Sequence, residues 1–198
     1  MIPRQYWIMT VLLFSLAVAM AIYVWQLRKR EVLNPPPAPT AQHVSPPAAG
    51  PVQQVTLWVA YDKEAALHME RISIPLTSNR QQRAEELVRG LISRYAEKNS
   101  PHPMAAGSDL HDVYLLDPGL ALLDLNSAFV DSQTSGVLAE ELTLASIVQT
   151  LSANIPGILR VKILVDGRER DTLAGHADLS GAYDVAQVSE LAKQLTAR

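Results

Sequence analysis

The sequence predicts an α/β domain in which a mixed sheet carries two main helices on one face, preceded by one N-terminal transmembrane helix. Three observations support this prediction. Residues 6–27 contain no charged side chain, short runs with strand periodicity recur through residues 53–198, and two longer segments carry apolar stripes at helical spacing. Strands interspersed with helices pack most simply as a sheet covered by helices.

The N-terminal segment predicts an uncleaved membrane anchor. Residues 6–27 are long enough to span a hydrocarbon core, which needs about 20 apolar residues, and aromatic rings lie at both ends. The alternative is a cleaved signal peptide, whose apolar core is about 7–15 residues long and is followed by a small-x-small cleavage site. The only such triplet here lies inside the apolar run, so we expect an anchor preceded by a short tail, 1–5.

The charges beside the anchor favour a cytoplasmic location for the rest of the chain. Arg28, Lys29 and Arg30 follow the apolar segment directly, whereas only Arg4 precedes it. The positive-inside rule, taken alone, places the side with more basic residues in the cytoplasm. This orientation conflicts with the one implied by the family resemblance described below.

Residues 28–52 predict a basic flank and a proline-rich tether. Seven prolines fall between positions 35 and 51, and they favour extended, polyproline-like chain with no core to pack against. At about 3.1 Å per residue, such a spacer holds the following domain at a distance from the bilayer. The globular domain is expected over residues 53–198.

Composition excludes several classes of function. The chain has no cysteine, which excludes disulfides, thiolate metal sites, a cysteine nucleophile and a lipidated cysteine. Residues 1–34 carry a formal net charge of +3, whereas the remainder carries 13 basic and 19 acidic residues. Phosphate contacts need a basic patch, so we expect no nucleic-acid partner for this acidic domain.

Two strands and a helix open the domain. Residues 55–61 are largely apolar on both faces, as in a strand inside a sheet, and residues 69–76 form a second extended run. Ser78 and Gln81 have the spacing of a capping box, which predicts the start of a helix. An apolar stripe continues along this helix to Tyr95.

A hairpin and a second helix follow a polar loop. Residues 113–116 and 120–125 predict two strands joined by a tight Asp-Pro-Gly turn. Residues 135–154 predict a helix whose apolar stripe is broad enough to imply heavy burial. A further strand is expected over 161–165, where Asp-Gly then gives a hairpin signal, and a short amphipathic helix over 185–195.

No catalytic or metal-binding motif occurs in the sequence. HExxH, GxSxG, GxxxxGK[ST] and GxGxxG are all absent. Asp109, His111 and Asp112 are metal-ligand types, but in a polar loop such side chains are usually solvated, and zinc sites have closer and more numerous ligands. We therefore expect no catalytic residue, no cofactor-binding residue and no metal ligand.

Two further groups of polar residues have a structural interpretation. The pairs Glu85-Glu86 and Glu140-Glu141 are neighbours on predicted helices, where side chains about 100° apart do not converge on a substrate, so we expect solvated faces. Residues 176–180 contain His, Asp and Ser close together. Triad members normally come from distant segments, so this stretch is expected to be a structural loop.

Several short segments together resemble the GerMN domain family of sporulation and spore germination. They are Val55–Tyr61, Leu123-Asp124-Leu125 followed by Phe129, Thr150-Leu151, Pro156-Gly157-Ile158 and Val161–Gly167. The resemblance covers most of residues 53–181 and includes one copy of the domain. It implies an extracytoplasmic, non-catalytic α/β module similar to ring-building domains, and it names no catalytic residue.

Two functions follow as hypotheses. The first is a non-enzymatic assembly or binding module of the cell envelope, held in the cell membrane by a single span, with its head outside the cytoplasm and in contact with itself or another envelope protein. The alternative is an envelope ligand-binding domain or a weak cell-wall hydrolase. A deep polar pocket with converging carboxylates would favour the alternative, whereas an exposed apolar patch or sheet edge would favour the first.

Overall fold

The computed structural model describes Met20 and residues 51–196. The predicted anchor, 6–27, apart from Met20, and the predicted tether, 28–52, apart from residues 51 and 52, lie outside the described residues. Among the residues that are described, no helix has the length and apolar composition needed to cross a membrane. The chain divides into two compact units, 1–48 and 49–198, and the second unit is the globular domain.

The globular domain contains six strands and four helices within the described residues. The strands are β1 Val52–Tyr61, β2 Ala66–Pro75, β3 Leu110–Leu116, β4 Leu120–Leu125, β5 Arg160–Val165 and β6 Tyr183–Asp184. The helices are α2 Arg80–Tyr95, α3 Ser127–Asp131, α4 Val137–Asn154 and α5 Val185–Thr196.

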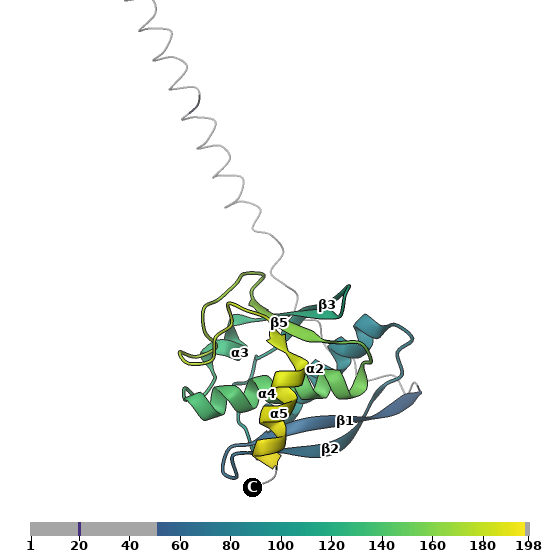
Figure 1. The fold of residues 1–198 in the computed structure, drawn as a ribbon, viewed down its shortest axis with the longest axis horizontal. Coiled ribbons are helices and arrows are strands. Elements are labelled where there is room, and N and C mark those ends of the chain that lie inside the picture. Colours follow the sequence, from purple (N-terminus) through teal and green to yellow (C-terminus); the bar gives the residue numbers. More distant parts are fainter. Residues whose placement is uncertain (1–19, 21–50, 197–198) are drawn as a thin grey trace, which may run out of the picture. The chain divides into compact units, whose positions relative to one another are not determined.

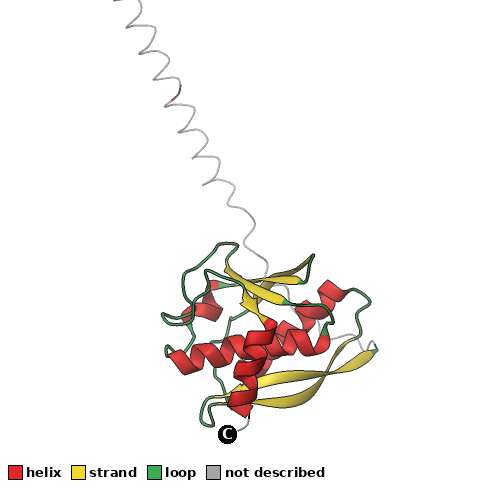
Figure 2. Cartoon of the chain, viewed as in Figure 1, coloured by secondary structure: helices red, strands yellow, loops and turns green. Residues whose placement is uncertain are grey.

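The strands form two separate sheets. The order in the larger sheet is β3-β4-β5-β6, with β4 and β5 parallel and the other neighbours antiparallel, so the predicted mixed sheet is confirmed. β1 and β2 form an antiparallel hairpin of their own. Figures 1 and 2 show α4 between this hairpin and the larger sheet. The expectation of one sheet that includes the first two strands was therefore wrong.

Polar side chains of α4 explain why β1 does not join the larger sheet. The Thr150 hydroxyl accepts a hydrogen bond from Trp58 N at 2.9 Å, and the Ser146 hydroxyl donates to Trp58 O at 2.5 Å. One turn farther along, Asn154 Oδ1 accepts from Thr56 N and Asn154 Nδ2 donates to Thr56 O. The helix thus satisfies backbone groups that a neighbouring strand would otherwise bind, and it covers an edge of the hairpin.

The apolar stripe of α2 lies as the sequence predicts. Its buried residues are Ala84, Leu87, Val88, Leu91, Ile92 and Tyr95. The helix begins at Arg80, and its N-cap is Asn79, whose Oδ1 accepts from Gln81 N at 2.9 Å. The predicted Ser78 cap was therefore wrong by one residue, because Asn and Ser serve about equally well at this position.

Between β5 and α5 the chain follows a long loop. The predicted Asp166-Gly167 turn is present, and it closes an isolated antiparallel bridge between Val165 and Arg168. No full hairpin strand follows, and residues 169–182 form loops and turns before the short strand β6. Leu173 and Leu179 of this loop are fully buried in the core, so the loop packs as part of the domain.

Candidate functional site

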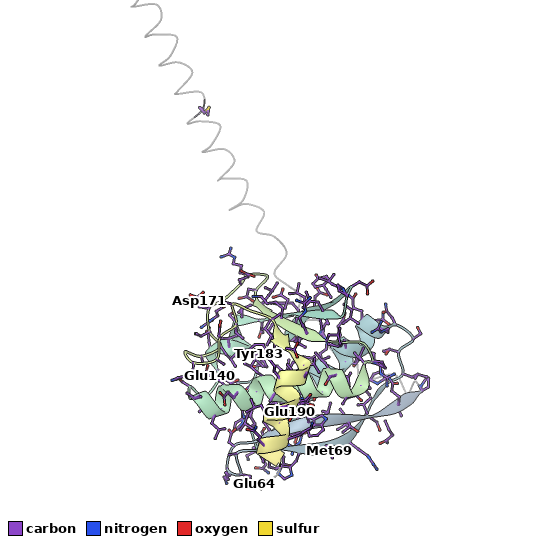
Figure 3. The ribbon with its side chains drawn as sticks, viewed as in Figure 1. Glu64, Met69, Glu140, Asp171, Tyr183 and Glu190 are labelled. Carbon is purple, nitrogen blue, oxygen red and sulfur yellow. The ribbon has the colours of Figure 1, made fainter. Side chains whose placement is uncertain are left out.

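A cleft of about 460 Å³ lies between α4, the 169–182 loop, β6 and α5. Its lining combines apolar helix residues with carboxylates, a histidine and a tyrosine. The lining residues are Glu141, Leu144, Ala145, His176, Ala177, Asp178, Gly181, Ala182, Tyr183, Asp184, Gln187, Val188 and Leu191. Figure 3 shows Tyr183 beside the start of α5, with Glu190 farther along that helix.

A buried carboxylate fixes the loop that forms one wall of the cleft. Glu140 on α4 is fully buried. Its Oε2 accepts hydrogen bonds from the backbone N–H groups of Ala174, His176 and Ala177 at 2.8–3.0 Å. Its Oε1 lies 2.9 Å from His176 Nδ1 and accepts from Gly136 N at 3.2 Å.

The environment of Glu140 strongly favours its charged form. Burial by itself raises the pKa of this carboxyl, and the hydrogen bonds from the Ala177, His176 and Ala174 N–H groups and from the His176 ring together outweigh it. The net effect lowers the pKa to about 2. Our expectation that both members of the Glu140-Glu141 pair are solvated was therefore wrong for Glu140, while Glu141 lines the cleft.

The His-Asp-Ser stretch at 176–180 shows no catalytic connection. The His176 ring pairs with Glu140, and Asp178 Oδ1 accepts from Ser180 N at 2.7 Å in a local turn. The His176 ring is not hydrogen-bonded to the Asp178 carboxylate among the described residues. The structure places the stretch in a loop, as the sequence predicts; its structural role stays a prediction.

The electrostatic field in the cleft is negative. Burial and the nearby charges of Asp178, Glu140 and Glu141 raise the pKa of Tyr183 to about 12. The Tyr183 hydroxyl donates its hydrogen bond to the Asp178 carbonyl. The tyrosine is thus a neutral donor at neutral pH, surrounded by carboxylates.

The face of the larger sheet that points away from the core carries a group of apolar side chains beside the charged residues Asp112, Asp124 and Lys162. We define this outer sheet face by Tyr114, Leu116, Leu120, Leu122 and Leu164. Cross-strand pairs place Tyr114 opposite Leu122 and Leu116 opposite Leu120. Tyr114 is 43% and Leu116 47% exposed, and β3 is an edge strand. Exposed apolar side chains on an edge strand mark a surface able to bind another protein.

A family model for sporulation and spore germination, named Germane, matches residues 56–171. This match spans more than half of the chain, and it includes most of the hairpin, α2, the first three strands of the larger sheet and α4. The chain belongs to the Germane family. The resemblance to GerMN domains inferred from the sequence is therefore confirmed.

Solved structures are similar to this Germane domain. The tandem GerMN domains of the sporulation protein GerM from Bacillus subtilis match with a TM-score of 0.51 and 19% identity, covering 68% of this chain and 46% of that one. A candidate lipoprotein from Clostridium perfringens matches with a TM-score of 0.47 and 22% identity, over 71% of this chain and 92% of that one. The comparison with curated proteins gives no match.

The Germane domain also holds a buried histidine that the sequence did not single out. His102 is 1% exposed. Its Nδ1 lies 2.5 Å from Asp62 Oδ1, its Nε2 lies 2.8 Å from Thr143 Oγ1, and Gln133 Nε2 is 3.3 Å from the same ring nitrogen. Thr143 is fully buried and donates to Ala139 O, so its hydroxyl is closed to a substrate. These contacts join the β1–β2 turn, the 97–109 loop and α4.

The Asp109, His111 and Asp112 cluster does not converge on one point. His111 Nε2 lies 3.1 Å from Asp166 Oδ1, whereas Asp109 Oδ1 accepts from Leu110 N. Asp112 instead accepts from a tyrosine hydroxyl on its own strand. No group of three metal-ligand side chains occurs within the part of the chain that the structure describes.

Proposed function

We propose that this Germane-family protein is a non-enzymatic assembly or binding module of the cell envelope, held in the cell membrane by residues 6–27. The outer sheet face is the observation that carries this proposal. It places exposed Tyr114 and Leu116 on an edge strand, and Leu159, 59% exposed, lies at the same end of the sheet beside the β3–β4 turn. Such a surface supports binding to a second copy of the protein or to another envelope protein.

The head is proposed to lie outside the cytoplasm. The Germane family is described by sporulation and spore germination. Membership supports a role in the cell envelope. The basic residues after the predicted anchor do not oppose export decisively, because domains longer than about 60 residues are translocated largely regardless of charge. A C-terminal alkaline phosphatase fusion that stays inactive, together with an active cytoplasmic reporter fusion, would place the head inside and contradict this proposal.

The contacts of the polar residues support a non-enzymatic role over a weak hydrolase. The two carboxylates of the Glu140-Glu141 pair have different surroundings. The Glu140 carboxylate accepts hydrogen bonds from backbone N–H groups, whereas Glu141 lies on a wall of the cleft. The His176 ring is paired with the buried carboxylate. A hydrolase needs a base that is free to reach its substrate, and Glu140 and the His176 ring are engaged with the protein itself.

Proximity cross-linking of the full-length protein in its native membrane tests the role of the outer sheet face. We expect protein adducts with the wild type and a strong reduction with Leu116→Glu, because a charge on this face opposes apolar contact. Val137→Glu is the matched control, since Val137 is an exposed apolar residue at the start of α4, outside the outer sheet face. Equal adducts in all three proteins would contradict this proposal.

A further inference from the structure

The cleft beside α5 has an apolar floor and an acidic rim. The floor is formed by Leu144, Ala145, Val188 and Leu191. The rim carries three carboxylates from three different elements: Glu141 on α4, Asp178 in the loop and Asp184 on β6. This cleft is separate from the outer sheet face, so the inference drawn from it stands independently of the function proposed above.

The rim carboxylates keep acceptor capacity that the protein does not use. Asp178 Oδ1 accepts from Ser180 N at 2.7 Å, and Asp184 Oδ1 accepts from Ala186 N at 2.8 Å at the start of α5. Asp184 Oδ2 has no hydrogen-bond partner among the described residues. The Glu141 carboxylate has neither a hydrogen bond nor an ion pair there.

The nearby cationic groups do not neutralise this rim. Lys162 is 8% exposed, and its ammonium donates to Leu179 O and Ser180 O and lies 3.3 Å from Glu169 Oε1. It lies close enough to help lower the pKa of Asp178, after the larger effect of the hydrogen bonds from Ser180. Arg160 is a second nearby cation, because it lies opposite Asp184 in the β5–β6 ladder. The three rim carboxylates outnumber these two cations, and Lys162 also pairs with Glu169, so the cleft retains a net negative charge.

We propose that this cleft binds a lysine side chain, with an adjoining apolar residue, from a partner polypeptide. The aliphatic stem of lysine matches the apolar floor, and its ammonium group matches the acidic rim. An ammonium group has three donors in no fixed plane, so it suits single acceptors that come from different elements. A guanidinium is best matched by both oxygens of one carboxylate, and of the three rim residues only Glu141 offers both, because Asp178 and Asp184 each use one oxygen already.

The openness of the rim favours a polypeptide over a free amine. His176, Asp178, Gly181, Ala182 and Gln187 are exposed to solvent, so the cleft is a surface groove. Sites for small ligands usually bury about 70–90% of the ligand surface. A peptide can bring residues on both sides of the lysine to cover the rim, which a small amine cannot do.

A peptide titration tests this inference on the full-length protein in detergent micelles. The probe is a fluorescent, blocked leucine-lysine-leucine tripeptide, and its control replaces lysine with norleucine, which keeps the stem and removes the ammonium. We expect the lysine peptide to bind about tenfold more tightly, as expected for a few partly exposed charge interactions, and to weaken as salt is raised. Empty micelles provide the background anisotropy.

Charge-only substitutions assign the binding to the rim. In the triple variant Glu141→Gln, Asp178→Asn, Asp184→Asn, both asparagines keep an oxygen that can still accept the hydrogen bond from the local backbone N–H. We expect this variant to bind the lysine peptide about tenfold more weakly than the wild type does. Glu190→Gln is the matched control, because Glu190 lies on α5 outside the cleft lining and should leave affinity unchanged.

Each alternative outcome overturns the inference. Equal binding of the lysine and norleucine peptides removes the role of charge, and unchanged binding to the triple variant removes the role of the rim. Competition by free butylamine at the same concentration as the peptide assigns the site to small amines and overturns the polypeptide ligand. None of these results bears on the outer sheet face, which is tested separately by cross-linking. Failure of the lysine-binding inference can therefore be distinguished from failure of the proposed function.

Discussion

Replacing Glu140 with glutamine should loosen the wall of the cleft and destabilise the whole domain. One oxygen of the Glu140 carboxylate accepts hydrogen bonds from three backbone N–H groups. The other oxygen accepts a hydrogen bond from Gly136 N and faces the His176 ring. A glutamine oxygen can replace only one of the two carboxylate oxygens. Its NH₂ group then faces either Gly136 N–H or the loop N–H groups, so at least one buried donor loses its acceptor.

The magnitude follows from the pKa of Glu140. The folded state lowers this pKa from 4.5 to about 2, and each unit corresponds to about 1.4 kcal/mol of stabilisation of the charged form. The charged carboxylate therefore contributes about 3 kcal/mol at neutral pH. Since glutamine retains part of the hydrogen bonding, we expect Glu140→Gln to lower the free energy of unfolding by about 2–3 kcal/mol. For a domain of this size, that is a drop in Tm of about 5–10 °C.

The stability difference between wild type and Glu140→Gln should depend on pH in a definite direction. Because the folded pKa of Glu140 lies below the unfolded one, its stabilisation is fully present above pH 4.5 and is lost as pH falls towards about 2. Glutamine does not titrate. The difference in stability between wild type and Glu140→Gln should therefore be largest near pH 7 and shrink as pH falls through this window.

Urea unfolding of residues 49–198 at pH 7, 5, 4 and 3 measures this difference. Glu141→Gln is the control, because the side chain of Glu141 has no hydrogen-bond or ion-pair partner among the described residues. The stability of this variant should stay within about 0.5 kcal/mol of wild type. Two results would refute the reasoning. One is a Glu140→Gln variant as stable as Glu141→Gln at pH 7, and the other is a stability difference that stays constant from pH 7 to pH 3.

Three further predictions concern the fold. Leu87→Asp and Leu151→Asp should each unfold the domain, seen as loss of cooperative thermal unfolding, because both leucines are fully buried and an aspartate there would be an unpaired buried charge. Gly119→Ala should lower the unfolding free energy by about 1–3 kcal/mol in urea, because Gly119 has φ +77° and its new Cβ would lie 2.6 Å from a backbone oxygen. Thr150→Val keeps the shape but leaves Trp58 N–H without its acceptor, so we expect a loss of about 1–3 kcal/mol, and hydrogen exchange should show faster exchange at that amide. Wild-type stability in any of these variants would show that its assigned contact is wrong.

The local spacing of apolar residues was enough to predict the helices and strands in which buried residues recur at regular intervals. The stripe of α2 and the β3–β4 hairpin are examples, because each depends on residues close together in sequence. The position of β1 was not predictable in this way. Its backbone partners, Ser146, Thr150 and Asn154, lie about 90–100 residues away and look like ordinary small polar residues within a helix. Only their spacing of four residues hints that they share one face.

The candidate site was the least predictable part of the chain. A glutamate on a helix is normally solvated, so nothing in the sequence indicates that Glu140 is buried and binds a loop 34–37 residues away. The same holds for His102, whose partner Asp62 is 40 residues away. Residues 176–180 were predicted to form a loop. The cleft beside them is also lined by residues of α5, and no short sequence motif indicates that α5 packs next to this loop.

Site-specific cross-linking in the native membrane tests the central claim most directly. The chain has no cysteine, so a single cysteine at Tyr114 or Leu116 of the full-length protein reports on the outer sheet face, and one at Glu190 reports on a surface outside it. The account predicts specific adducts, with itself or with one other envelope protein, from Tyr114→Cys and Leu116→Cys and few from Glu190→Cys. Equal or absent adducts at all three positions, together with hydrolysis of a cell-envelope substrate that is lost on His176→Ala, would contradict it.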